Sequence, residues 1–156
     1  MTAWLGALLT GDPPPGVYRW PSRAHPGALD RELARAGWAG YLLPRPVTDA
    51  GRFLDGCATA LAFPGWFGHS WEALADCLAD LSWLPAAGHV LLWERYGMLA
   101  AADAKMWRRA YETLETALAT RVRYAAPPLY VLLRGSGPVA SPVDGAPIPV
   151  LPATRP

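Results

Sequence analysis

Hydrophobic residues along the chain occur either in short uninterrupted runs or at helical spacing, with turns rich in proline and glycine between them. The uninterrupted runs are typical of strands that are covered on both faces, and they lie at 38–43 (WAGYLL), 89–93 (HVLLW) and 129–133 (LYVLL). A weaker strand candidate is 17–20 (VYRW). Apolar positions three and four residues apart predict helices over 26–36, 49–61, 71–81 and 103–121.

Strands that alternate with helices indicate a parallel sheet packed by helices. We therefore expect an α/β fold with a small parallel three-stranded sheet, to which 17–20 would add a fourth, N-terminal edge strand. The expected organisation is an N-terminal extension with one helix, a central domain and a Pro-rich tail, at 1–37, 38–134 and 135–156. Residues 1–16 end in GDPPPG, which is expected to form a linker or a fixed turn rather than a packed element. The composition of the tail predicts disorder.

Local sequence also predicts how individual elements begin and end. Thr48 is the expected N-cap of helix 49–61, and Ser70 that of helix 71–81. Pro44 and Pro46 are expected to end the strand 38–43, because proline cannot donate a hydrogen bond to a sheet.

Charge is segregated along the chain, although the formal net charge is only +1. Residues 49–94 hold one arginine against six acidic groups, whereas the segments on either side are both net basic. A nucleic-acid-binding protein would concentrate basic groups around its site. The acidic centre of this chain therefore favours a basic protein partner over direct binding of nucleic acid.

The predicted helix 71–81 carries three carboxylates on one stripe, because Glu72, Asp76 and Asp80 are four residues apart. No Lys or Arg occurs in the surrounding segment FPGWFGHSWEALADCLADLSWL to neutralise them. Like charges at this spacing disfavour an isolated helix by a few tenths of a kcal/mol per pair. A solvated helix face is the simplest interpretation, but the preceding loop, which places Trp66 at a turn, favours a binding surface.

The segment FPGWFGHSWEALADCLADLSW resembles the signature of the barstar family, proteins related to the inhibitor of the ribonuclease barnase. The signature is an aromatic pair, a glycine, and then a helix with an acid, Ala–Leu and Asp–Cys–Leu. The resemblance is specific over these residues and architectural over the rest of 38–134. It implies a sheet of three parallel strands packed by helices, and a partner that is a cationic ribonuclease or related toxin nuclease.

The resemblance also implies residue roles, with carboxylates that imitate the phosphates of RNA. Asp76 matches the family's central aspartate, Glu72 a second acid one turn earlier, and Trp66 the first residue of the aromatic pair. Ala75 stands where barstar has a tryptophan contact, and Ser70 where it has an asparagine. The expected partner-binding surface comprises Trp66, Phe67, Gly68, His69, Ser70, Glu72, Ala75, Asp76, Ala79 and Asp80. A further acid on the long helix is implied, and Glu112 and Glu115 are its candidates.

Two other function classes are open at this point. A metal held by His69, Glu72 and Asp76, or a nucleophilic Cys57 or Cys77, would make the protein an enzyme. We expect no catalysis, no cofactor and no metal, since no glycine-rich phosphate loop precedes a helix. A barstar-fold interaction module with a non-nuclease partner is the alternative, and the replacement at Ala75 motivates it.

Cellular location can also be predicted. Both cysteines lie in helical contexts beside apolar residues, as buried reduced thiols of a cytoplasmic protein do. The N-terminal AWLGALL lacks the basic residue and the cleavage site of a signal peptide, and no apolar run approaches the roughly 20 residues of a membrane span. We expect a cytoplasmic protein without membrane association that is monomeric when free.

Overall fold

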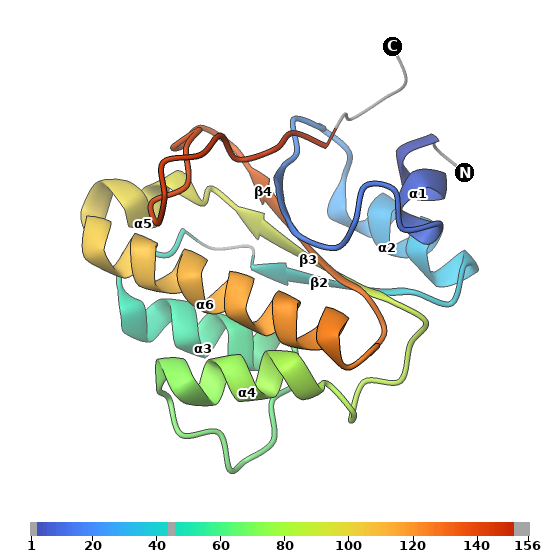
Figure 1. Ribbon diagram of the computed structural model, residues 1–156, viewed down its shortest axis with the longest axis horizontal. Coiled ribbons are helices and arrows are strands. Elements are labelled where there is room, and N and C mark those ends of the chain that lie inside the picture. The colour runs from blue at the N-terminus through green and yellow to red at the C-terminus, as the bar shows by residue number, and fades with distance from the viewer. Residues whose placement is uncertain (1–2, 44–45, 152–156) are drawn as a thin grey trace.

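A computed structural model describes residues 3–43 and 46–151, and four strands of these residues form one parallel sheet. The strands are β1 (Val17–Arg19), β2 (Ala39–Leu43), β3 (His89–Glu94) and β4 (Leu129–Arg134). Their order across the sheet is β1-β4-β3-β2, and each neighbouring pair is parallel (Figure 1). The predicted α/β fold is confirmed, with β1 as the additional edge strand.

Helices cover both faces of the sheet (Figure 1). One face carries α1 (Ala3–Leu9) and α2 (Pro26–Arg35). The other carries α3 (Ala50–Ala60), α4 (Trp71–Asp80), α5 (Gly97–Ala102) and α6 (Ala104–Arg123). The four predicted helices are confirmed with small shifts at their ends, whereas the short helices α1 and α5 were not predicted.

Alternate residues of the central strands enter two separate hydrophobic cores. Val90 and Leu92 of β3 belong to the core beneath α1 and α2, and Leu91 and Trp93 belong to the core beneath α3–α6. Side chains of a strand point alternately to its two faces. Because both faces of this sheet are buried, the strands read as continuous apolar runs, as the sequence indicated.

Residues 11–16 (GDPPPG) form turns and bends, as expected, but the helix α1 that precedes them is packed and was not predicted. Leu5 and Leu8 of α1 are buried in the second core. The hydroxyl of Tyr130 in β4 donates a hydrogen bond to the carbonyl oxygen of Pro13 at 2.7 Å. The two leucines lie three residues apart, so even a seven-residue helix can bury one face.

The Pro-rich C-terminal segment is also ordered through residue 151, and the predicted disorder of 135–156 is wrong for this described part. Ile148 and Leu151 are each 2% exposed. The amide of Arg19 donates to the carbonyl of Pro149, and the amide of Leu151 donates to the carbonyl of Arg19, both at 2.8 Å. The segment thus pairs with the outer edge of β1, and two buried aliphatic side chains hold it in spite of its composition.

Helix α3 begins one residue later than predicted, because Asp49 and not Thr48 is its N-cap. The Asp49 carboxylate accepts a hydrogen bond from the amide of Arg52 at 2.8 Å. A carboxylate in this position satisfies a free amide and interacts favourably with the helix dipole. Pro44, one of the two prolines expected to end the strand before it, lies outside the described residues.

Candidate functional site: the acidic face of helix α4

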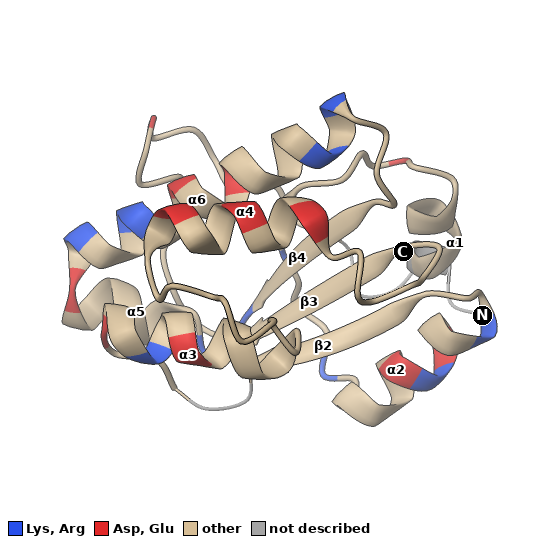
Figure 2. Cartoon of the chain, turned by 90° about the horizontal axis from the view of Figure 1, so that it is seen from below, with Lys and Arg blue, Asp and Glu red and all other residues tan. Residues whose placement is uncertain are grey.

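Helix α4 is held by its apolar face and leaves its acidic face to solvent. The hydroxyl of Ser70 caps the helix by accepting a hydrogen bond from the amide of Ala73 at 3.0 Å. The buried side chains of the helix are Leu74, Cys77 and Leu78. The exposed ones include Glu72, Asp76 and Asp80. Figure 2 shows these acidic segments along α4, beside α6. The expected stripe therefore exists on the surface.

The three carboxylates differ in what they contact. That of Asp76 forms no hydrogen bond or ion pair with any residue that the structure describes. That of Asp80 accepts a hydrogen bond from the amide of Ser82 at 3.2 Å. That of Glu72 lies 3.2 Å from the guanidinium of Arg109 in α6, with side chains 76% and 43% exposed. The expectation that all three acids are unpaired is thus wrong for Glu72. Its cation is on α6, which packs beside α4 but lies 37 residues further along the chain.

A second arginine of α6 fixes the other end of α4. The guanidinium of Arg121, 2% exposed, donates through Nη1 to the carbonyl oxygens of Leu78, Ala79 and Asp80 at 3.1–3.2 Å. Burial lowers the pKa of Arg121, and the nearby Tyr41 and Asp80 offset only part of this shift. A cation at a helix C-terminus interacts favourably with the dipole there. This contact offsets the unfavourable position of the last acid of the stripe.

Aromatic rings in edge-on and tilted contacts shape the loop that precedes α4. The ring of Phe67 lies 4.9 Å from that of Phe63 and 5.0 Å from that of His69, measured between centroids. Phe63 in turn meets Trp83 edge-on at 6.0 Å, and the Trp83 indole donates to the carbonyl of Leu61 at 2.9 Å. Phe67 is therefore half-buried, and its ring helps to hold the loop in place.

The tip of this loop presents Trp66 to solvent, with 64% of the side chain exposed. His69 ties the loop to α3, since its Nδ1 lies 3.0 Å from a carboxylate oxygen of Asp55. Gly68 and His69 are exposed. Trp66 is thus a large apolar group held on an ordered loop, a combination common at protein-binding surfaces.

The remaining predicted surface residues also lie on or beside α4. Ala75 and Ala79 are partly exposed next to the acids, so that a partner could approach the helix closely. Glu115, by contrast, is near Asp144 of the C-terminal segment. Burial, followed by the charges of Asp144 and Glu112, raises the pKa of Glu115. On α6, Arg109 forms an ion pair with Glu72 of the stripe. A role of Glu112 or Glu115 at a partner surface stays a prediction.

Sequence reasoning missed Arg109, Arg121 and Asp55 as contributors to this surface. The first two lie twelve residues apart on a predicted helix, so their side chains leave the helix in directions about 120° apart. The sequence therefore gives no sign that both arginines contact α4.

The residues considered for catalysis lie in separate surroundings. Cys57 and Cys77 are both buried and free, and burial raises the pKa of each thiol. Such cysteines are poor nucleophiles, because the thiolate is the reactive form. His69 contacts Asp55 rather than the stripe. No group of three or more possible metal ligands occurs among the residues described.

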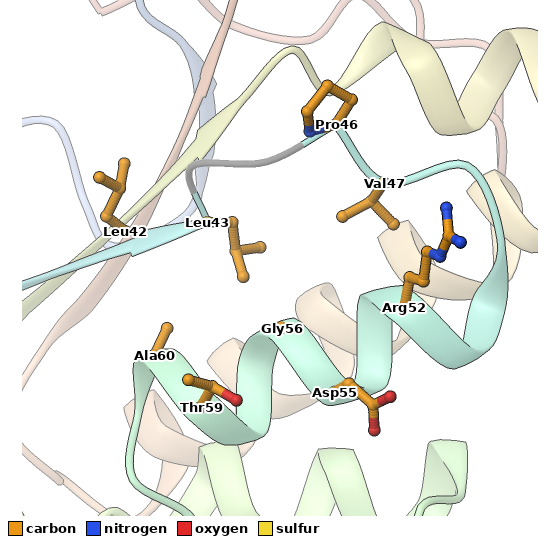
Figure 3. Close-up of a pocket in the computed structure, with 9 residues that line it drawn as sticks. All are labelled: Leu42, Leu43, Pro46, Val47, Arg52, Asp55, Gly56, Thr59 and Ala60. Carbon is orange, nitrogen blue, oxygen red and sulfur yellow. The ribbon is translucent and has the colours of Figure 1, made fainter.

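A pocket of about 840 Å³ lies away from the stripe, between the end of β2 and α3 (Figure 3). Its wall is mainly aliphatic, and its charged residues are Arg52 and Asp55. Both of these are already engaged, Arg52 with Asp49 at 3.7 Å and Asp55 with His69. Its lining residues Leu43 and Pro46 are separated in the chain by two residues that the structure does not describe, so that the pocket defines no site.

The molecule is an α/β protein in which a four-stranded parallel sheet, covered by helices on both faces, carries an exposed acidic helix and an exposed aromatic loop. The family described as Barstar (barnase inhibitor) matches residues 43–134, and the chain belongs to this family. No curated protein matches the chain. Among the helices of the described residues, none has the length and apolar character needed to cross a membrane.

Proposed function

We propose that the protein is a cytoplasmic inhibitor of a cationic ribonuclease or related toxin nuclease, and that α4 and the loop of Trp66 plug the active site of the enzyme. The observation that carries this proposal is the carboxylate of Asp76, exposed in the middle of α4 without a hydrogen bond or ion pair in the described chain. The description of the family names an inhibitor of barnase, a ribonuclease, and this supports a nuclease partner.

The physical basis is charge complementarity with a cleft that binds RNA phosphates. Asp76 would meet the basic groups of that cleft, and pairs of this kind are strengthened when the interface excludes water. In the complex of barnase with barstar, close charge pairs of this kind are worth about 1.5–7 kcal/mol. The negative stripe would also accelerate association at low salt.

The fixed position of α4 adds to the affinity. The cap at Ser70 and the guanidinium of Arg121 hold the two ends of the helix in the free chain. A surface that is ordered before binding loses less conformational entropy on association. In this proposal the protein acts stoichiometrically, without catalysis, and is a monomer until it meets the nuclease.

An interaction module with a non-nuclease partner is the second candidate. Two features favour it, namely Ala75 in place of the expected tryptophan and the cation Arg109 beside the acids. A nuclease bound to the surface and inhibited by it would exclude this alternative. Capture of a partner without a basic cleft would support it.

The experiment compares Asp76→Asn with Asp144→Asn in binding catalytically inactive barnase and in inhibiting the active enzyme. Both changes remove one negative charge, but Asp144 lies beside Glu115 and not on α4. We expect D76N to weaken binding at least about tenfold more than D144N, a difference of about 1.4 kcal/mol. Equal affinities for the two variants would contradict the role of Asp76.

A further inference from the structure

We propose that Arg109 is a specificity-determining residue, which disfavours uniformly cationic partners and selects a basic cleft that brings a carboxylate to the N-terminal end of α4. This inference rests on the proposed function and identifies the partner chemistry more closely. It starts from the ion pair between Arg109 and Glu72, which sets a cation beside the acidic stripe of α4.

The ion pair changes what α4 offers to a partner. Nη2 of Arg109 donates to Oε1 of Glu72 at 3.2 Å, and the Arg109 side chain makes no other hydrogen bond with the described residues. The guanidinium has further donors, and the side chain is 43% exposed, so that a partner covering α4 can reach it. The N-terminal end of the stripe is therefore close to neutral, whereas Asp76, one turn on, forms no ion pair with any described residue.

Binding would change the environment of these donors. A partner that covers α4 removes water from Arg109, and buried donors without acceptors are costly. If the facing surface were cationic throughout, Arg109 would also meet like charge. A facing carboxylate removes both penalties, because it pairs with the guanidinium in the bidentate manner that arginine favours. Discrimination by such a mismatch is a common source of specificity.

Arg108 provides a matched control on the same helix. It is exposed and precedes Arg109, so its side chain leaves α6 about 100° away, and it makes no ion pair among the described residues. Replacing either arginine by glutamine changes the net charge by the same amount. A difference between Arg108→Gln and Arg109→Gln therefore reports local contacts with α4 and not long-range attraction.

The probes are two amidated nine-residue peptides, one entirely of arginine and one with glutamate as its central residue. Affinities are measured at low ionic strength, where electrostatic contacts are least screened. R109Q should bind the all-arginine peptide at least about threefold more tightly than R108Q does, the modest effect expected for an exposed ion pair. The gain in affinity of R109Q over R108Q should be smaller for the peptide that contains glutamate.

The double variant Glu72→Gln/Arg109→Gln tests whether Arg109 acts by pairing with the Glu72 carboxylate. Without that carboxylate, the double variant should bind the all-arginine peptide no more tightly than R108Q does. Equal affinities of R109Q and R108Q, an equal gain for both peptides, or a gain that persists in the double variant would each overturn the inference. The comparison of D76N with D144N against inactive barnase reports on the proposed function by itself. A failure of the Arg109 inference can thus be distinguished from a failure of that function.

Discussion

Arg121 donates a hydrogen bond from its buried guanidinium to the main-chain carbonyl of Asp80 at 3.2 Å, and thereby joins the last turn of the acidic helix to α6. The same nitrogen reaches the carbonyls of Leu78 and Ala79, and the rest of the guanidinium donates to the carbonyl of Pro127. One side chain thus satisfies several carbonyl groups that the end of a helix leaves free. The position of the candidate binding surface depends on this contact.

The first prediction is that Arg121→Met destabilises the protein by about 3 kcal/mol, because the carbonyls that Arg121 satisfies lose a buried charged donor. Arg121→Lys should cost less, since it keeps the charge but not the planar set of donors. Urea unfolding measures both. Arg123→Met, at an exposed position two residues on, is the control and should stay within about 0.5 kcal/mol of the parent chain. Equal losses at the two positions would contradict this role.

The second prediction concerns pH and follows from His89, which is 1% exposed and whose Nδ1 lies 2.8 Å from the Tyr41 hydroxyl. Burial, and then the charge of Arg121, lowers the pKa of His89 from 6.5 to about 4. The unfolded chain therefore takes up the proton at a higher pH than the folded chain. The stability due to neutral His89 is complete above pH 6.5 and is lost as the pH falls to about 4.

This shift corresponds to a loss of about 3 kcal/mol, at about 1.4 kcal/mol for each unit of pKa. Urea unfolding between pH 7 and pH 4 measures the loss. His89→Gln, which cannot take up the proton, should flatten the profile by that amount relative to the parent chain. An unchanged slope in the variant would show that His89 is not the responsible group.

The strands and most helices were predictable because each depends on a local pattern. A sheet covered on both faces requires continuous apolar strands, and HVLLW and LYVLL meet that requirement. The C-terminal segment was not predictable in the same way, because Ile148 and Leu151 are isolated aliphatic residues among prolines. Their burial depends on the outer edge of β1, which no local pattern reveals.

For the candidate site, the acidic stripe was predictable and its counter-charge was not. Four-residue spacing alone places the three acids on one side of a helix. The pairing of Glu72 with Arg109 joins residues 37 positions apart, and it depends on how α4 packs against α6. Contacts of this kind are tertiary, and for that reason sequence reasoning expected free carboxylates where the folded chain supplies one partner.

The third prediction separates the two aromatic residues of the loop. Trp66 projects into solvent, whereas Phe67 packs between Phe63 and His69. Trp66→Ala should change the free energy of unfolding by no more than about 0.5 kcal/mol but weaken the binding of inactive barnase at least about tenfold, as loss of an aromatic anchor does. Phe67→Ala should instead destabilise the chain by about 1–2 kcal/mol. A loss of stability in W66A as large as that in F67A would show that Trp66 is a packing residue.

The fourth prediction tests the contribution of the C-terminal segment through two neighbouring residues. Leu151 is 2% exposed in the core that also contains Leu5 and Tyr18, whereas Val150 is 47% exposed. Leu151→Ala removes buried apolar volume and should lower the free energy of unfolding by about 2–4 kcal/mol. Val150→Ala leaves the backbone pairing with Arg19 intact and should cost less than about 1 kcal/mol. Both are measured by urea unfolding. Equal and small effects would mean that the segment dissociates from β1 in solution, and the exposed strand edge would then favour association between chains.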